Sequence, residues 1–235
     1  MVRVVEAADD DEDENEPVRA RARAILRATS PTFLSLPYEE ALAFFESLEV
    51  VSIDEFRAIQ DRFREGAWSA ALIESQHLRE LAKKRIGEAL AGNMTVRETA
   101  AAIRNDQIAL GVSPNSHDYL DLVARNAVAT AYGHGKWVAA NDPAIRAARP
   151  FWQYLTVNDG RVRPNHRALH ERVFRIGTEE HALYFPPLGH RCRCSGRTLS
   201  PSQMERWGLT VTEGVIEGVM PDPGWEAPPR PTSTE

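Results

Sequence analysis

Hydrophobic positions between 17 and 149 recur at steps of three and four, the spacing of helices that bury one face. Pro17 can begin a first helix, and a second stripe resumes after the proline at 37. Its members are Leu42, Phe45 and Leu48. Ser52 and Glu55 then form a capping-box signature, and the apolar spacing beyond them predicts one long helix that runs on to about 90.

Two further helices follow. A turn at 92–93 ends the long helix, and Thr95 is placed to cap a short one. The next helix begins near Ser116 and keeps the three-and-four spacing until Gly133 and Gly135, which are expected to loosen it.

The pattern changes at Pro150. The stretch "FWQYLTVND" alternates and is rich in aromatic and β-branched residues, which predicts a strand, and "DGRVRP" predicts a turn. A short helix in "NHRALHERVFRIG" then leads into a second strand at 173–176. The predicted class is α+β and mainly helical: a helical N-terminal region, then a small mixed α+β domain with a short hairpin or sheet.

Charge changes the picture only at the N-terminus. The chain carries −6, but residues 1–16 hold eight acids against Arg3, so residues 17–235 sum to +1. So dense an acidic run predicts a solvated, disordered tail, with contact to a basic partner as the alternative. No apolar run approaches the roughly 20 residues of a membrane span, and no secretory leader is recognisable, so we expect a protein of the producing cell's cytoplasm.

The chemistry is concentrated between 151 and 197, which holds eight arginines, no lysine, four of the seven histidines and both cysteines. Zinc takes Cys and His ligands in structural sites. The candidate ligands are His166, Cys192 and Cys194, with His170 or His190 as the fourth. An extended Cys-x-Cys would point its two side chains to opposite sides, so buried or idle thiols and a strained disulfide stay open as alternatives.

A catalytic reading also exists. His166, His170, Arg161 and Arg163 lie within ten residues and have the chemistry of a general base and a phosphate clamp in a nuclease or toxin-like effector. No carboxylate pair, glycine-rich phosphate loop or nucleophile elbow accompanies them, so we expect no catalysis. Three roles remain open for the arginines: ion pairs within the chain, contacts with nucleic-acid phosphates, or contacts with a protein partner.

Four separated motifs give a resemblance that covers roughly residues 116–225. The stretches "FWQYLTVNDGRVRPNHRALHERVF", "YFPPLGHRCRC" and "PDPGWEAPP" follow in order and spacing those of the phage Mu protein F-like minor head proteins, also called phage head morphogenesis proteins. The motif residues are Asp159, Arg161, Arg163 and His166, then Pro186 and Pro187, then Cys192, Arg193 and Cys194, then the Pro-Asp-Pro-Gly-aromatic run. The family has an aspartate-glycine turn where this chain has His170, and it varies at position 190, so the resemblance supports neither as a ligand.

The resemblance implies a minor structural protein of a tailed phage, a prophage or a gene-transfer-like particle, acting in head assembly. Its implied partners are the portal and other head proteins, with DNA as a further contact. The resemblance implies neither a membrane partner nor a small-molecule substrate. Its implied location is the virion, in the head interior or at the portal, after assembly in the host cytoplasm. His166 and the two thiols would hold the hairpin ends together, with or without zinc.

Within that resemblance the remaining motif residues are implied to face a partner; they are Asp159, Arg161, Arg163, Pro186, Pro187 and Arg193. The implied organisation is an acidic tail at 1–16, a helical region at 17–115, the head morphogenesis domain at 116–200 and an extended C-terminal tail at 201–235.

Overall fold

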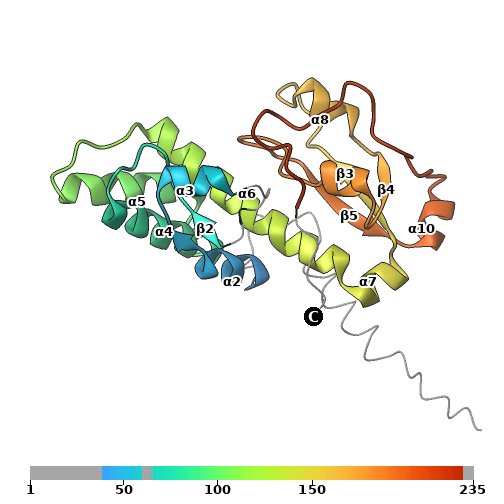
Figure 1. Cartoon of the computed structure of the whole chain (residues 1–235), viewed down its shortest axis with the longest axis horizontal. Helices are drawn as coiled ribbons and strands as arrows, with labels where there is room; N and C mark the ends of the chain where they lie inside the picture. Colours follow the sequence, from blue (N-terminus) through green and yellow to red (C-terminus); the bar gives the residue numbers. More distant parts are fainter. Residues whose placement is uncertain (1–38, 60–63, 65, 230–235) are drawn as a thin grey trace, which may run out of the picture.

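The computed structural model describes residues 39–59, 64 and 66–229. The protein is α+β and mainly helical, as predicted, with a helical half and a sheet half side by side along its longest axis (Figure 1). The acidic run at 1–16, the helix expected from 17 and the end of the C-terminal tail lie outside the described residues.

The helical half contains α2 (Glu39–Ser47), α3 (Ile53–Ala58), α4 (Gln76–Leu90), α5 (Val96–Ala109), α6 (His117–Asn141) and α7 (Pro143–Ala148). Two short strands, β1 (Glu49–Val50) and β2 (Ala67–Trp68), pair in parallel between these helices. The predicted caps are confirmed: Ser52 and Thr95 each form a reciprocal capping box, and the Ser116 side chain accepts from the third residue of α6. No helix in the described ranges is both long and apolar enough to cross a membrane.

The single long helix predicted from 53 to about 90 is wrong. α3 ends at Ala58, and α4 begins only at Gln76. Between them Arg64 and Gly66 have φ values of +48° and +85°, which a right-handed helix excludes. The Arg64 guanidinium donates to the carbonyls of Phe56 and Ile59 at the end of α3, so a later side chain satisfies them in place of a continued helix.

The expected loosening of the helix at Gly133 and Gly135 is also wrong, because α6 continues through both to Asn141. Both glycines are buried, and His134 between them stacks on Phe44 of α2 with ring centroids 3.7 Å apart. Tertiary packing against α6 therefore offsets the poor helix propensity of glycine.

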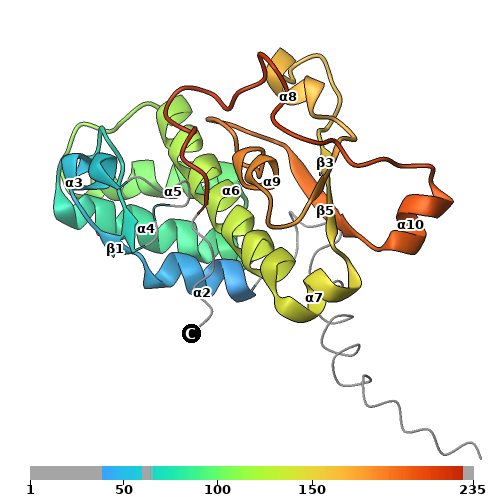
Figure 2. The ribbon, with the colours of Figure 1, turned by 45° about the vertical axis from the view of Figure 1, so that its right-hand side comes forward.

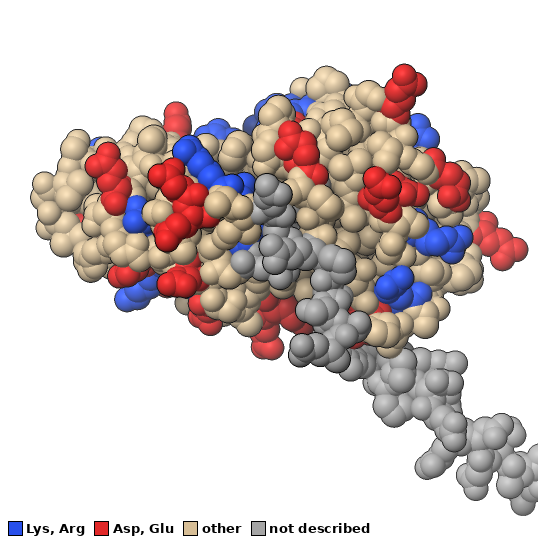
Figure 3. Space-filling model, in the orientation of Figure 1, with Lys and Arg blue, Asp and Glu red and all other residues tan. Residues whose placement is uncertain are grey.

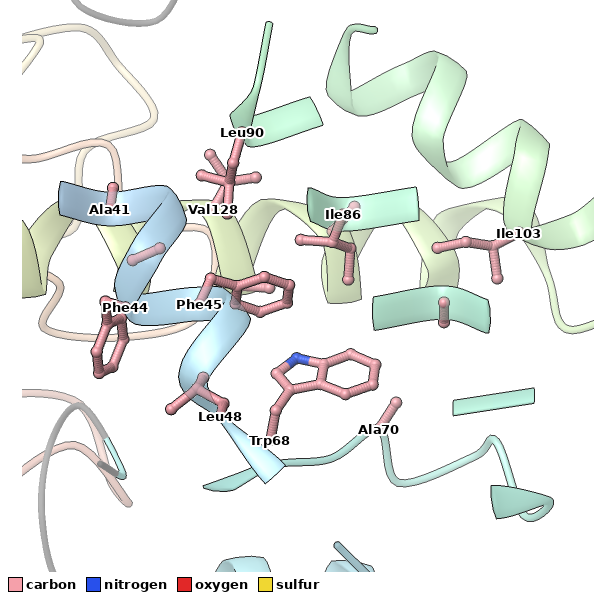
Figure 4. Packing of buried hydrophobic residues seen from close by; sticks show 14 of the residues in the cluster. Ala41, Phe44, Phe45, Leu48, Trp68, Ala70, Ile86, Leu90, Ile103 and Val128 are labelled. Carbon is pink, nitrogen blue, oxygen red and sulfur yellow. The ribbon is translucent and has the colours of Figure 1, made fainter. Parts of the chain in front are cut away.

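The helical half buries a conventional apolar core (Figure 4). Phe45 of α2 meets the edge of Trp68 with centroids 6.1 Å apart, and Ile86 of α4 is fully buried. Ile103 of α5 is 2% exposed in the same cluster. The stripe at Leu42, Phe45 and Leu48 therefore faces the core as predicted, whereas α3, at the start of the predicted long helix, buries no residue.

The sheet half is built on three antiparallel strands in the order β4 (Val173–Arg175), β3 (Phe151–Leu155) and β5 (Ser195–Leu199). Trp152 in the central strand faces Phe174 on one side and Thr198 on the other. Three short helices surround the sheet: α8 (Pro164–Ala168), α9 (Glu179–Leu183) and α10 (Pro201–Arg206). The predicted strands at 151 and 173 and the helix between them are confirmed.

The expectation of an extended tail from 201 is wrong at its start, where Ser200 caps α10 in a capping box. After α10 the chain bridges to β4 at Val211 and then runs back past α8 toward α6, as both ribbon views show (Figures 1 and 2). Val219 is buried along this return path. The segment therefore covers the sheet half.

One hydrophobic cluster joins the two halves. Trp137 of α6 stacks on His181 of α9 with ring centroids 5.1 Å apart, and Trp152 and Phe185 of the sheet half pack against the same rings. Figure 2 shows α9 lying between α6 and the strands. The helical and sheet halves consequently share a core.

Candidate metal centre

Two thiols and an imidazole meet in the sheet half. Nδ1 of His166, on α8, lies 3.7 Å from Sγ of Cys192 and 3.5 Å from Sγ of Cys194. The ligand atoms of the three residues all lie within 4.8 Å of one another, and His166 is 2% exposed. Among the described residues, this is the group of His, Cys, Asp and Glu side chains close enough to hold a metal ion together.

The backbone before β5 explains how both sulfurs reach one ring. Arg191 has a φ of +55°, and the Cys192 N–H donates to the carbonyl of Gly189 at 3.2 Å, so this part of the loop is a turn. An extended Cys-x-Cys would send the side chains apart. The turn removes that objection and brings both Cys192 and Cys194 to His166.

The cluster shifts the pKa values of the two thiols in opposite directions. The neighbouring Cys194 thiol and then His166 hydrogen-bond to Cys192 and lower its pKa despite burial, which acts to raise it. The Cys194 thiol hydrogen-bonds to Cys192, and this contact together with burial raises its pKa. The pair thus favours one thiolate, the form in which cysteine binds metals.

Each of the three groups has a further partner. Oδ1 of Asp222 lies 3.5 Å from Nε2 of His166, on the opposite side of the ring from the sulfurs. Tyr154 acts to lower the pKa of the Cys194 thiol, and the Leu188 backbone acts to lower that of Cys192. Such outer contacts orient metal ligands in proteins.

Neither histidine considered as a fourth ligand reaches the cluster. Nδ1 of His170 accepts a hydrogen bond from the backbone of Thr156 at 3.1 Å. Nδ1 of His190 lies 2.7 Å from the Asn126 side chain, and its ring meets Trp225 edge-on. The helical spacing of His166 and His170 therefore does not produce a shared site, and the described part of the chain brings three candidate ligands together.

The motif arginines are mostly engaged within the chain. Arg193 makes two hydrogen bonds of 2.7 Å to the carboxylate of Asp159 and holds the pKa of that carboxyl well below its usual range. Nε of Arg163 lies 3.2 Å from Asp222. Arg161 also lies 3.6 Å from Asp159, but its side chain is 83% exposed and so stays the most accessible of the three.

The double proline has a different place from the one expected. Pro186 and Pro187 are both buried, so they are not surfaces for a partner. Their position follows from the surrounding segment, since Phe185 and Leu188 on either side are also buried in the two neighbouring clusters.

Sequence reasoning missed Asp222. The residue lies in the "PDPGW" run, which contributes to the sequence analysis only as part of the family resemblance. Nothing in local spacing places it beside His166, 56 positions earlier, because that contact depends on the return of the C-terminal segment past α8. The carboxylate between two prolines was the available signal.

The fold and the cluster define a small α+β module whose sheet half closes around a Cys₂His group. The family model described as "Phage Mu protein F like protein" matches residues 78–197, half of the chain. The chain belongs to that family. The match runs from α4 into β5 and contains His166, Cys192 and Cys194.

Three relatives match shorter stretches. Protein F of Escherichia phage Mu, whose name proposes a role in capsid assembly, is 41% identical over 85 residues, 36% of this chain and 19% of that protein. The Mu-like prophage FluMu F protein of Haemophilus influenzae is 31% identical over 86 residues, 33% of this chain and 21% of that protein. An uncharacterized protein of Methanocaldococcus jannaschii is 48% identical over 55 residues, 22% of this chain and 9% of that protein.

The matched part of the chain spans about a fifth of the length of the two phage-type relatives. No solved structure matches the chain. The comparison therefore defines the family of the module, and the activity of the whole protein is a separate question.

Proposed function

We propose that the chain is a non-catalytic component of head assembly in a tailed phage or a prophage-like particle. The observation that carries this proposal is the family match across 78–197, together with the capsid assembly role in the name of Mu protein F. On this proposal the chain works with the portal and other head proteins. It is located in the virion, in the head interior or at the portal, after assembly in the host cytoplasm.

The geometry supports assembly over the nuclease or toxin-like alternative. His166 would be the base of such an enzyme, but its ring is 2% exposed and its Nδ1 faces two sulfurs. Arg163, the nearest candidate for a phosphate clamp, is paired with Asp222. The candidate base is thus not presented to a substrate, although Arg161 of the clamp is 83% exposed.

DNA is the less favoured partner. On the face shown in Figure 3, Lys and Arg side chains are interspersed with Asp and Glu over both halves. Nucleic-acid binding of useful strength draws on a cluster of basic side chains. Arg161, which is 83% exposed, is the motif residue best placed to contact a partner of either kind.

We also propose that zinc staples the sheet half through His166, Cys192 and Cys194. Tetrahedral zinc, with Zn–S of about 2.3 Å and Zn–N of about 2.0 Å, separates a sulfur from a nitrogen ligand by about 3.5 Å. The two distances from Nδ1 of His166 to the sulfurs, 3.5 and 3.7 Å, match that separation. The ion would supply a cross-link between α8 and the loop that leads into β5, in a half with few long elements.

The assembly role is tested in the particle whose genome encodes the chain. Deleting the gene should lower the yield of filled heads, and mass spectrometry should find the chain in wild-type particles. Complementation with the wild-type gene should restore the yield. Complementation with a Cys192→Ser, Cys194→Ser double variant should fail if the staple is needed for that role.

Filled heads at normal yield without the gene, and particles free of the chain, would overturn the assembly proposal. A nuclease assay on the same purified protein separates the alternative. DNA cleavage that His166→Ala abolishes would replace assembly with catalysis.

A further inference from the structure

We propose that Asp222 is a positioning residue of the metal centre, and that it couples metal binding to the docking of the C-terminal segment 219–229. This inference rests on the zinc site proposed above. It concerns a residue outside the part of the chain that the family model matches, which ends at 197.

The carboxylate of Asp222 contacts α8 and the residue before it. Its Oδ1 lies 3.5 Å from Nε2 of His166 and accepts a hydrogen bond of 3.1 Å from the Asn165 side chain. Its Oδ2 lies 3.2 Å from Nε of Arg163. One acidic side chain from a distant segment therefore organises the element that carries the imidazole ligand.

The backbone of Asp222 contacts the other side of the centre. Its N–H donates to the carbonyl of Leu188 at 2.9 Å, in the segment that leads to the two cysteines. Leu188 also hydrogen-bonds through its backbone to Cys192. Asp222 thus touches both elements that the metal would join.

The fold leaves a notch for this carboxylate at Gly189. A Cβ built there would lie 1.9 Å from Oδ2 of Asp222 and 2.6 Å from its Cγ. Such distances are sterically impossible, so any larger residue would displace the aspartate. Gly189 is buried, and its φ is not in the left-handed region, so space and not backbone conformation requires the glycine.

The contact would favour the tautomer of His166 whose Nδ1 lone pair faces the sulfurs. A carboxylate beside Nε2 favours the proton on that atom, which leaves the lone pair of Nδ1 directed at Cys192 and Cys194. A neutral imidazole with a free lone pair is the form that binds a metal. Asp222 would therefore act through His166 and not as a ligand itself.

The same residue anchors the segment around it. The Trp225 N–H donates to the carbonyl of Asp222 at 2.9 Å, and Asn165 donates to the carbonyl of Met220 at 2.8 Å. If docking of this segment strengthens metal binding, metal binding must strengthen docking by the same factor.

The first test is zinc affinity of the full-length protein, measured by competition with a chromogenic chelator. Removing an outer-shell carboxylate typically costs roughly 10–100-fold in affinity, and we expect a loss in that range for Asp222→Ala. Asp222→Asn and Gly189→Ala should weaken binding in the same direction. Glu217→Gln is the matched control, because it removes an exposed charge two residues before the segment, and it should bind as the wild type does.

The second test is hydrogen exchange of peptides covering 213–229, with zinc and with chelator. In the wild type, zinc should slow exchange at 219–225, and in Asp222→Ala it should not. Asp222→Asn and Gly189→Ala provide the same readout if the alanine variant does not fold.

The outcomes are distinguishable. A wild type that takes up no zinc overturns the staple and this inference together. Normal zinc uptake by the wild type, combined with unchanged affinity and unchanged exchange in all three variants, overturns the role of Asp222 alone. Loss of affinity in Glu217→Gln as well would show an effect of net charge and would also overturn it.

Discussion

The helical half and the sheet half are held together by different means. In the helical half, helices of 14, 15 and 25 residues pack apolar stripes against each other. In the sheet half, the described helices are five or six residues long, and side-chain contacts such as those of Asp159 and Asp222 connect the segments. The long helices are stabilised by apolar faces that their local sequence pattern creates. The short elements depend instead on side-chain contacts between residues far apart in the sequence.

The shared core lies where the two kinds of structure meet. Trp137 comes from α6, and Trp152 and Phe185 come from the sheet half. His181 among them is 0% exposed. Mutations in the helical half and in the sheet half should therefore separate two contributions to stability: apolar packing in the first, and close fit and polar contacts in the second.

The largest effect is expected in the helical core. Ile86→Ala removes a fully buried side chain from α4 and leaves a cavity, which costs about 3–4 kcal/mol in the free energy of unfolding. Urea denaturation of the full-length protein measures it. Leu72→Ala, at a side chain 60% exposed, is the control and should change stability by less than about 0.5 kcal/mol. Equal losses for the two variants would contradict the assigned core.

A smaller effect on stability is expected when a glycine is replaced by alanine, and its sign should differ between the sheet and a helix. A Cβ at Gly196 would lie 2.3 Å from the Trp152 ring and 2.6 Å from the carbonyl of Gln153, so Gly196→Ala should cost about 2–3 kcal/mol. Gly87 in α4 has open space, and Gly87→Ala should raise stability by about 0.5–1 kcal/mol. Thermal unfolding of both variants measures the pair, and shifts of the same sign would refute the comparison.

The stability that His181 contributes in the core shared by the two halves should depend on pH. Burial, and secondarily Arg146, lower the pKa of His181 from 6.5 to about 3. The unfolded chain therefore binds a proton that the folded chain does not, so this contribution to stability is complete above pH 6.5 and declines toward pH 3.

Within that window the slope is about 1.4 kcal/mol per pH unit for one proton. Urea denaturation between pH 6.5 and 5 should show a steeper loss for the wild type than for His181→Leu, whatever the absolute stability of the variant. Parallel slopes would mean that His181 is not buried as a neutral ring.

The smallest effect concerns a helix end. Thr95→Ala removes the side chain that accepts from Glu98 N–H at the start of α5 and should cost about 0.5–1 kcal/mol. Thr95→Ser keeps the hydroxyl and is the control. A loss of the same size in both variants would show that the cap does not account for the effect.

Local pattern predicted most of the helical half. The stripe at Leu42, Phe45 and Leu48, the caps at Ser52 and Thr95 and the start of α6 all depend on neighbouring residues. The break at Arg64 and Gly66 was missed because the apolar spacing continues across it. The continuity of α6 through its glycines was missed because packing, not propensity, decides it.

The candidate site was predicted only in part. His166, Cys192 and Cys194 stand out by residue type and do come together. The fourth-ligand candidates were chosen by sequence proximity, but His170 and His190 are held elsewhere by Thr156 and Asn126. A distant contact such as that of Asp222 requires the path of the whole C-terminal segment.

The zinc site is tested most directly by the metal content of the purified, untagged full-length protein, measured by elemental mass spectrometry beside the Cys192→Ser, Cys194→Ser double variant. We expect about one zinc per chain in the wild type and none in the variant. A wild type without metal, or equal metal in both proteins, would contradict the stapled sheet half.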